Sequence, residues 1–374
     1  MTKIIPYHQQ ALEACAQDIA SFMTMLEMMI QHPQVALLSY GLVAPSAMFV
    51  IESHKCITTL FPELQNVISV SHADLLRTPR HRAKLLDDRT RTVDEVSKEF
   101  VRIAEEQRRF FLEPHKGFLG PLKRALQPDL GLTTYDGHII ATTHSTIFSF
   151  GGNRYIAQQH ALEFGEAVGY YTATLFNLLH LKPTIQITAT LPGEIEMKDI
   201  KYESLYQRSL FRSIPTKFAA GLIYLLATLN YTQYIFPAFL PQDGHTLFRI
   251  KFIAAFHANA NMMTIQNRLA RSSSWNPQVQ NLFGKALGNN DSRWLRRQRP
   301  LRNLLVHYLL DAQAVNNLPE NATRTETIEH LAGGRTYSEI DTLLDRHIRR
   351  LSHVLEAGFN LSRNTFWLGR VRNE

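Results

Sequence analysis

The stretch 302–307, of sequence RNLLVH, combines a permanent cation, an amide and a titratable imidazole within about one and a half helical turns. An arginine can neutralise charge developing on a phosphate, and a histidine can take or give a proton near neutral pH. The ribose 2′-OH would then attack its own phosphate, so RNA would be cut, DNA spared, and no metal required. The pattern therefore suggests an endoribonuclease with Arg302, Asn303 and His307 as catalytic residues.

These residues are expected on one helix that begins at Pro300, because proline suits a first helical position. Arg302 would then lie in the first turn, where unpaired backbone N–H groups favour an anion. Asn303 and His307 are four positions apart and share a side, so the amide could orient the imidazole or hold a phosphate oxygen. Arg302 and His307 lie about 140° apart around the helix. Two copies facing across a two-fold axis would bring two sets of these side chains into one cleft, which favours a homodimer.

A dense basic run, 292–302, precedes this helix. Guanidinium groups bind phosphate oxygens at two points, and a tryptophan can stack on an unpaired base. The alternative is a solvated, charged connection between helices. The RNA-binding candidates are Arg293, Trp294, Arg296, Arg297 and Arg299.

A long helix is predicted over 245–271, and it carries a polar stripe of Arg249, His257 and Asn261. This stripe is a candidate wall of the RNA cleft. The alternative interpretation is a set of ordinary surface or capping groups.

The composition is that of a folded protein with a basic excess. Of the 374 residues, 45% are hydrophobic, which is enough for a proper core. The net charge of +7 suits a polyanion such as nucleic acid or an anionic membrane face, and it is also compatible with a merely basic protein. Cys15 and Cys56 match no metal or redox spacing, and we expect neither a metal nor a cofactor. The longest apolar run, 218–227, is too short for a membrane span, and the first ten residues lack the apolar core of a signal peptide. We expect a cytoplasmic protein with no membrane association.

Hydrophobic periodicity predicts a mainly α fold in two parts. Region 1–195 is expected to be mostly helical, with a helix at 93–112 and candidate short strands near 132–150 and 183–192. Asp136-Gly137 is a hairpin-turn signal in the first of these. Region 196–374 is expected to form an antiparallel helical bundle ending in a helix at 336–359. The residues of the N-terminal half do not indicate its function.

The segment RNLLVHY (302–308) resembles the R-φ-x3-H signature of the HEPN superfamily, in which φ is a polar residue, commonly asparagine. The helix at 247–266 also resembles the one preceding the motif in some bacterial members, so the resemblance covers about residues 200–374. It implies a helical bundle and a metal-independent endoribonuclease of antiphage defence or toxin type, with Arg302, Asn303 and His307 in the site. It also implies an antitoxin or a defence-system protein as a partner.

Two other functions fit the same residues. The bundle could bind RNA or a nucleotide without cutting it, or it could be a structural adaptor in a defence complex in which the Arg–His pair is a coincidence. Loss of function in His307→Ala would favour the nuclease, whereas sensitivity to charge reversal at Arg296 and Arg297 alone would favour the binding module.

Overall fold

The computed structural model describes residues 4–66, 73–87, 92–112, 128–151, 154–182, 191–242, 244–271, 276–309, 318 and 322–361. Within these ranges the chain is mainly helical, as the sequence predicted, and it carries one small antiparallel sheet. No helix of the described part is long and apolar enough to cross a membrane.

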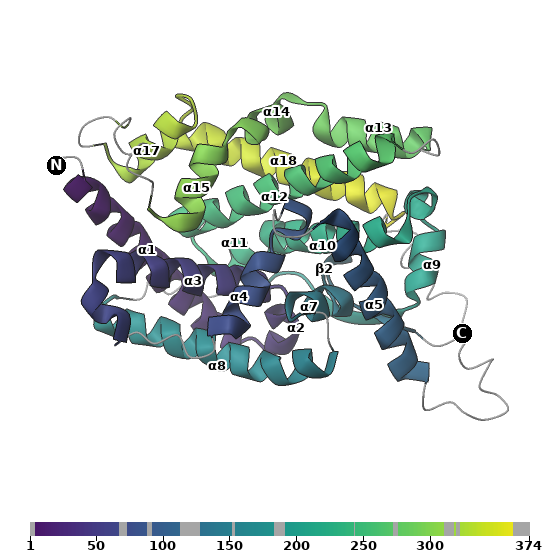
Figure 1. Ribbon diagram of the computed structural model, residues 1–374, viewed down its shortest axis with the longest axis horizontal. Coiled ribbons are helices and arrows are strands. Elements are labelled where there is room, and N and C mark those ends of the chain that lie inside the picture. Colours follow the sequence, from purple (N-terminus) through teal and green to yellow (C-terminus); the bar gives the residue numbers. More distant parts are fainter. Residues whose placement is uncertain are drawn as a thin grey trace.

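Helix α12 (His245–Ala270) is the central element, and helices from both halves of the chain pack around it (Figure 1). It contacts α1 (Ile4–Ile30) on one side and α15 (Arg299–His307) and α18 (Tyr337–Gly358) on the other. Its length matches the predicted 245–271. The other helices after residue 200 are α9 (Tyr202–Gln207), η3 (Leu210–Ser213), α10 (Thr216–Asn230), the π-helix η4 (Tyr231–Ile235), α11 (Phe236–Phe239), α13 (Pro277–Leu287), α14 (Asn290–Arg297) and α17 (Arg324–Leu331).

The N-terminal half is helical around the sheet. Helix α5 (Val93–Leu112) has the predicted bounds, with acidic residues in its first turn, where they stabilise the N-terminus. The others are α2 (Val35–Ser39), α3 (Val43–Leu60), η1 (Pro62–Asn66), α4 (Ala73–Arg82), η2 (Leu85–Asp87), α7 (Thr143–Ser149) and α8 (Arg154–Leu178).

The sheet has the order β2-β1-β3, all antiparallel. Strands β1 (Leu130–Tyr135) and β2 (His138–Thr142) form the predicted hairpin, because Asp136 and Gly137 both adopt the positive φ that this turn requires. The third strand is β3 (Ile195–Ile200), which the sequence did not predict. Of the expected strand at 183–192, residues 183–190 lie outside the described residues.

The expected strand near 132–150 is wrong in its second half, because residues 143–149 form α7. Thr142 starts this helix: its hydroxyl accepts from the Ser145 backbone N–H at 2.9 Å, and the Ser145 hydroxyl accepts from the Thr142 N–H at 3.0 Å. This reciprocal cap satisfies two N–H groups that a helix start otherwise leaves unpaired, and it outweighs the strand preference of the threonines and isoleucines nearby.

The expected boundary at 195/196 falls at the start of β3, which pairs along its length with β1. Buried hydrophobic residues on both sides of this position belong to one continuous cluster. The two halves therefore share one core, and side chains from α1, α3 and α4 reach the region of α15.

Candidate functional site

Helix α15 positions the motif because its apolar residues recur at helical spacing. Leu301, Leu304 and Leu305 are buried against the core, and this leaves the polar residues on the opposite, partly exposed side. The helix begins one residue earlier than predicted, at Arg299, with Pro300 in its first turn. Arg302, Asn303 and His307 are thus held on a rigid element at the protein surface.

The imidazole of His307 is bound by a buried carboxylate. Its Nδ1 lies 2.7 Å from Oε2 of Glu52, a residue of α3 that is 255 positions away. The Glu52 side chain is fully buried, whereas that of His307 is 36% exposed. With Nδ1–H donating to the carboxylate, Nε2 is the nitrogen that can exchange a proton with a ligand. A carboxylate that fixes the tautomer and orientation of a histidine in this way is a recurrent feature of proton-transfer sites.

Glu52 is in turn bound by Arg80 of α4. The Arg80 Nε lies 2.5 Å from Oε1 of Glu52, and its Nη2 donates to the same oxygen. Burial alone would raise the pKa of the Glu52 carboxyl, but the hydrogen bond with His307 and the charge of Arg80 outweigh it and lower the pKa to about 2. Glu52 is therefore an anion at any physiological pH.

Asn303 does not have the expected role of orienting His307, because Glu52 provides that contact. The Asn303 side-chain oxygen accepts instead from Nη1 of Arg302 at 3.1 Å. This bond leaves the amide beside the guanidinium, where both groups can contact one anion.

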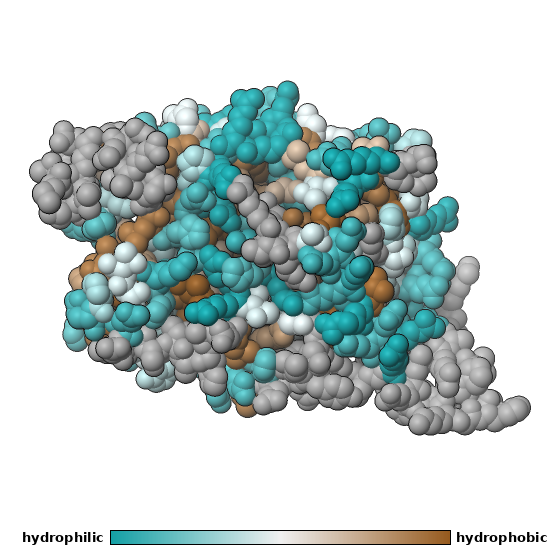
Figure 2. Space-filling view, in the orientation of Figure 1, coloured by the Kyte–Doolittle hydropathy of each residue, from teal (hydrophilic) through white to brown (hydrophobic). Residues whose placement is uncertain are grey.

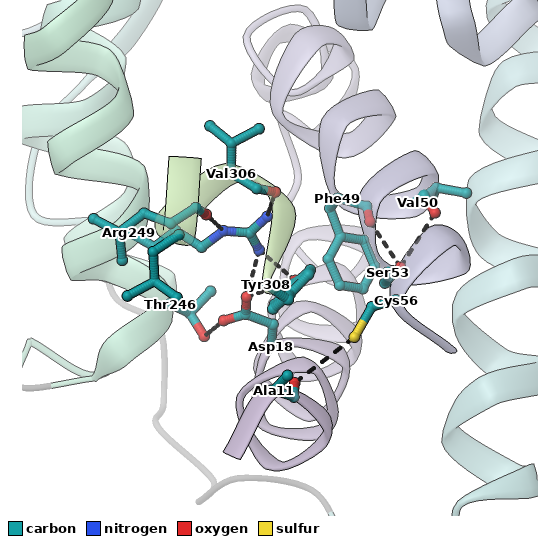
Figure 3. Close-up of polar contacts among 12 residues, drawn as sticks. Ala11, Asp18, Phe49, Val50, Ser53, Cys56, Thr246, Arg249, Val306 and Tyr308 are labelled. Atoms are coloured by element: carbon teal, nitrogen blue, oxygen red, sulfur yellow. Dashed lines mark hydrogen bonds and ion pairs between the residues drawn. The ribbon is translucent and has the colours of Figure 1, made fainter. Parts of the chain in front are cut away.

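The C-terminal end of α15 is held by buried side chains (Figure 3). The Arg249 guanidinium donates to the backbone oxygens of Leu305 and Val306, to the Tyr308 hydroxyl, and to the Asp18 carboxylate. Burial alone would lower the pKa of Arg249, but Tyr308 and Asp18 raise it. Arg249 thus satisfies carbonyl groups that a helix end leaves without partners.

Tyr308 follows the motif histidine in an unusual backbone conformation, with φ +59° and ψ −40°. Its carbonyl accepts from the Tyr7 hydroxyl at 2.8 Å, and its own hydroxyl donates to Asp18 at 2.7 Å. The Arg249 guanidinium carbon lies 4.2 Å from the centre of its ring. A positive φ is costly for a residue with a large side chain and persists only where the surroundings enforce it. The surroundings here end the helix at His307.

The expected cleft stripe is inside the protein. Arg249, His257 and Asn261 are all buried, so they do not form an open surface beside the motif. Asn261 accepts from the Leu86 N–H at 2.5 Å and donates to the Lys84 carbonyl at 3.1 Å, which fixes the segment after α4. Periodicity places these residues on one helix correctly, but it does not show that other elements cover them.

The arginine ridge, which we define as Arg293, Arg296, Arg297 and Arg299, is exposed on α14 and at the start of α15. Figure 2 shows hydrophilic side chains at the upper edge of the molecule, over α14. Residues 290–297 of this segment form the short helix α14, between α13 and α15. Trp294 differs from the arginines: it is half-buried, its Nε1 donates to the Ala332 carbonyl at 3.3 Å, and the Arg335 guanidinium lies 5.5 Å from its ring centre.

The contribution of Glu52 and Arg80 was missed from the sequence. The one available signal was a charged residue in an apolar stretch, since Glu52 follows AMFVI (47–51) in α3. A carboxylate so placed is buried only when it is paired.

Among the described residues, no group of three or more His, Cys, Asp or Glu side chains could hold a metal ion. No protein-family model, no curated protein and no solved structure matches this chain.

Proposed function

We propose that the protein is a metal-independent endoribonuclease whose general acid–base group is His307. The observation that carries the proposal is the hydrogen bond between His307 Nδ1 and the buried, ionised Glu52. A surface histidine without a catalytic role does not require a buried anion as its hydrogen-bond partner, and removing a carboxylate from water costs free energy. The anion fixes the orientation and the tautomer of the imidazole, which a proton-transfer group requires.

In the proposed reaction, Nε2 of His307 takes the proton of a ribose 2′-OH as the 2′ oxygen bonds to the adjacent phosphorus. The bond from phosphorus to the 5′ oxygen breaks, and that oxygen leaves with a proton. The products are a 2′,3′-cyclic phosphate and a 5′-hydroxyl. Arg302 neutralises the charge that develops on the phosphorane, and the Asn303 amide binds one of its oxygens.

A second copy of the chain is part of the proposal. One imidazole can take the first proton, but the leaving oxygen needs a donor at the same time. A homodimer with its two α15 helices facing would supply His307 of one copy as base and its counterpart as acid. The resemblance of RNLLVHY to the HEPN motif supports a cytoplasmic role in antiphage defence or as a toxin, with an antitoxin or a defence-system protein as partner.

The arginine ridge is the proposed RNA track. Four exposed guanidinium groups precede the motif by a few residues, and each can bind a phosphate at two points. Trp294 stays a candidate contact, although it is half-buried, because it lies on the same short helix as three of these arginines.

The test is RNA cleavage by the purified full-length protein in EDTA, with analysis of the product ends. We expect Arg302→Ala and His307→Ala to lose at least 100-fold in rate. We expect Glu52→Gln to lose activity without loss of RNA affinity. His353→Ala is the matched control, because His353 is an exposed histidine on α18, and it should cut like the wild type. Equal cleavage by all these variants would show that the activity lies elsewhere.

A non-catalytic RNA-binding module is the second candidate, and the arginine ridge favours it because the ridge does not depend on His307. RNA binding that persists in every variant, without cleavage by the wild-type dimer, would favour this function over the nuclease.

A further inference from the structure

An apolar cavity lies away from the motif, where α3, α7, α10, η4 and α12 meet. Its volume is about 90 Å³. The rim includes Tyr40, which is 40% exposed, and the half-buried Ala44 and Pro45. The inner wall includes Ile253 and Ala254 of α12. Protein interiors have few voids larger than a water molecule, so a cavity of this size needs an explanation.

Small side chains keep this space open. Ala83, Ala141, Ala227, Ala254 and Ala258 all line it, at positions where a leucine or a methionine would fill it. The π-helix η4 also contributes Tyr231 and Thr232 to the wall. A π-helical turn is uncommon and occurs often at functional sites.

The wall formed by Tyr231 is rigid. A Cβ atom at Gly41 would lie 2.1 Å from the Tyr231 ring, so the ring rests directly on the glycine backbone. The Tyr231 hydroxyl donates to the Leu38 carbonyl at 2.8 Å, and this bond fixes the ring. The cavity therefore has a preformed aromatic wall, as most small-molecule sites do.

The hydroxyl groups around the cavity are already bonded to nearby backbone. Ser149 donates to the Ser145 carbonyl at 2.9 Å, and Thr228 to the Tyr224 carbonyl at 2.9 Å. Thr232 donates to the Thr228 carbonyl at 2.8 Å. No Asp, Glu, Lys or Arg of the described residues lines the cavity. His257 of α12, which is buried, also lines the cavity, and the rest of the surface is mainly methyl groups, methylene groups and ring faces.

We propose that this cavity is a binding site for an uncharged apolar small molecule that inserts a single aromatic ring. A charged ring would bury its charge among mainly apolar side chains, at a cost above the gain from burial. An engineered apolar cavity of roughly 150 Å³ takes up benzene, so about 90 Å³ encloses most of one ring. The remainder of the ligand would extend past Tyr40 toward solvent. The proposal does not depend on the nuclease.

The test uses fluorobenzene as the probe, followed by fluorine NMR on the full-length protein. We expect saturable binding at one site, displacement by toluene, and no displacement by benzoate. Ala254→Leu fills the cavity and should weaken binding at least tenfold. Ala161→Leu is the matched control, because Ala161 is exposed on α8, and it should bind as the wild type does.

Circular dichroism would check that Ala254→Leu folds. If that variant does not fold, Ala44→Leu at the rim is tested in its place. Absence of saturable binding to the folded wild type would overturn the proposal. So would unchanged affinity in the filled variant, or displacement by benzoate as strong as that by toluene.

Discussion

Two groups of arginines near the motif helix have opposite environments. The exposed arginine ridge projects from α14 and the start of α15. Arg80 and Arg249 are buried, and each is paired with a buried carboxylate, Glu52 and Asp18. The buried pairs hold the motif helix and its histidine, whereas the ridge can meet a polyanion. An arginine that is paired with a buried carboxylate thus holds elements of the fold together, whereas an exposed arginine can contact a ligand at the surface.

The largest effect on stability is expected from a substitution in the buried pair of Arg249 and Asp18. Asp18→Asn would leave the Arg249 guanidinium buried without its counterion, so we expect the free energy of unfolding to fall by about 3–5 kcal/mol. Urea denaturation measures this change. Asp345→Asn is the control, because Asp345 is 37% exposed and Lys251 retains Asp341 as a partner. It should cost less than about 1 kcal/mol. Equal losses in both variants would remove the distinction between the two environments.

The second effect is a pH dependence. The pKa of Glu52 is lowered from 4.5 to about 2 in the folded protein, so its ionisation stabilises the fold above pH 4.5. That stabilisation is lost as the pH falls toward 2, and about 2 kcal/mol of it is gone by pH 3. Between pH 5 and pH 3 the stability of the wild type should therefore fall more steeply than that of Glu52→Gln. Parallel curves in urea titrations would contradict the pairing of the buried Glu52 with His307 and Arg80.

The smallest effect on stability is expected at the ridge. Replacing Arg296 and Arg297 with glutamine should change the free energy of unfolding by less than about 0.5 kcal/mol each. The same variant should lower the salt dependence of single-stranded RNA binding, with a slope smaller by about 1.4 for two lost phosphate contacts. Fluorescence anisotropy at several salt concentrations measures this slope. Arg108 and Arg109, two consecutive exposed arginines on α5, are the matched control, and an equal change there would show that charge alone determines binding.

The sequence predicted those parts of the fold that depend on local chemistry. Helix α5 and the turn at Asp136-Gly137 follow from periodicity and from the φ values that a tight turn demands. Helix α7 was missed because one reciprocal cap at Thr142 decides its start, and that cap is a weaker signal than a run of strand-forming residues.

The candidate site could be predicted only along its own helix. Arg302, Asn303 and His307 lie on α15, as their spacing indicated. Glu52 could not be assigned to them, because the contact depends on how α3 packs against α15, and no local pattern carries that information. The burial of Arg249 was missed for the same reason, since its partner Asp18 comes from α1.

The separation of Glu52 from His307 along the chain also determines which nascent or truncated chains can form the site. The two residues are 255 positions apart, so the contact cannot form until residue 307 has been synthesised. A nascent chain that ends before residue 307 already contains Glu52 and Arg80 but has no imidazole to orient. A proteolytic fragment that begins after Arg80 keeps the imidazole and loses its carboxylate. Neither truncated product holds a complete site, so any activity at this site requires a chain that spans at least residues 52–307.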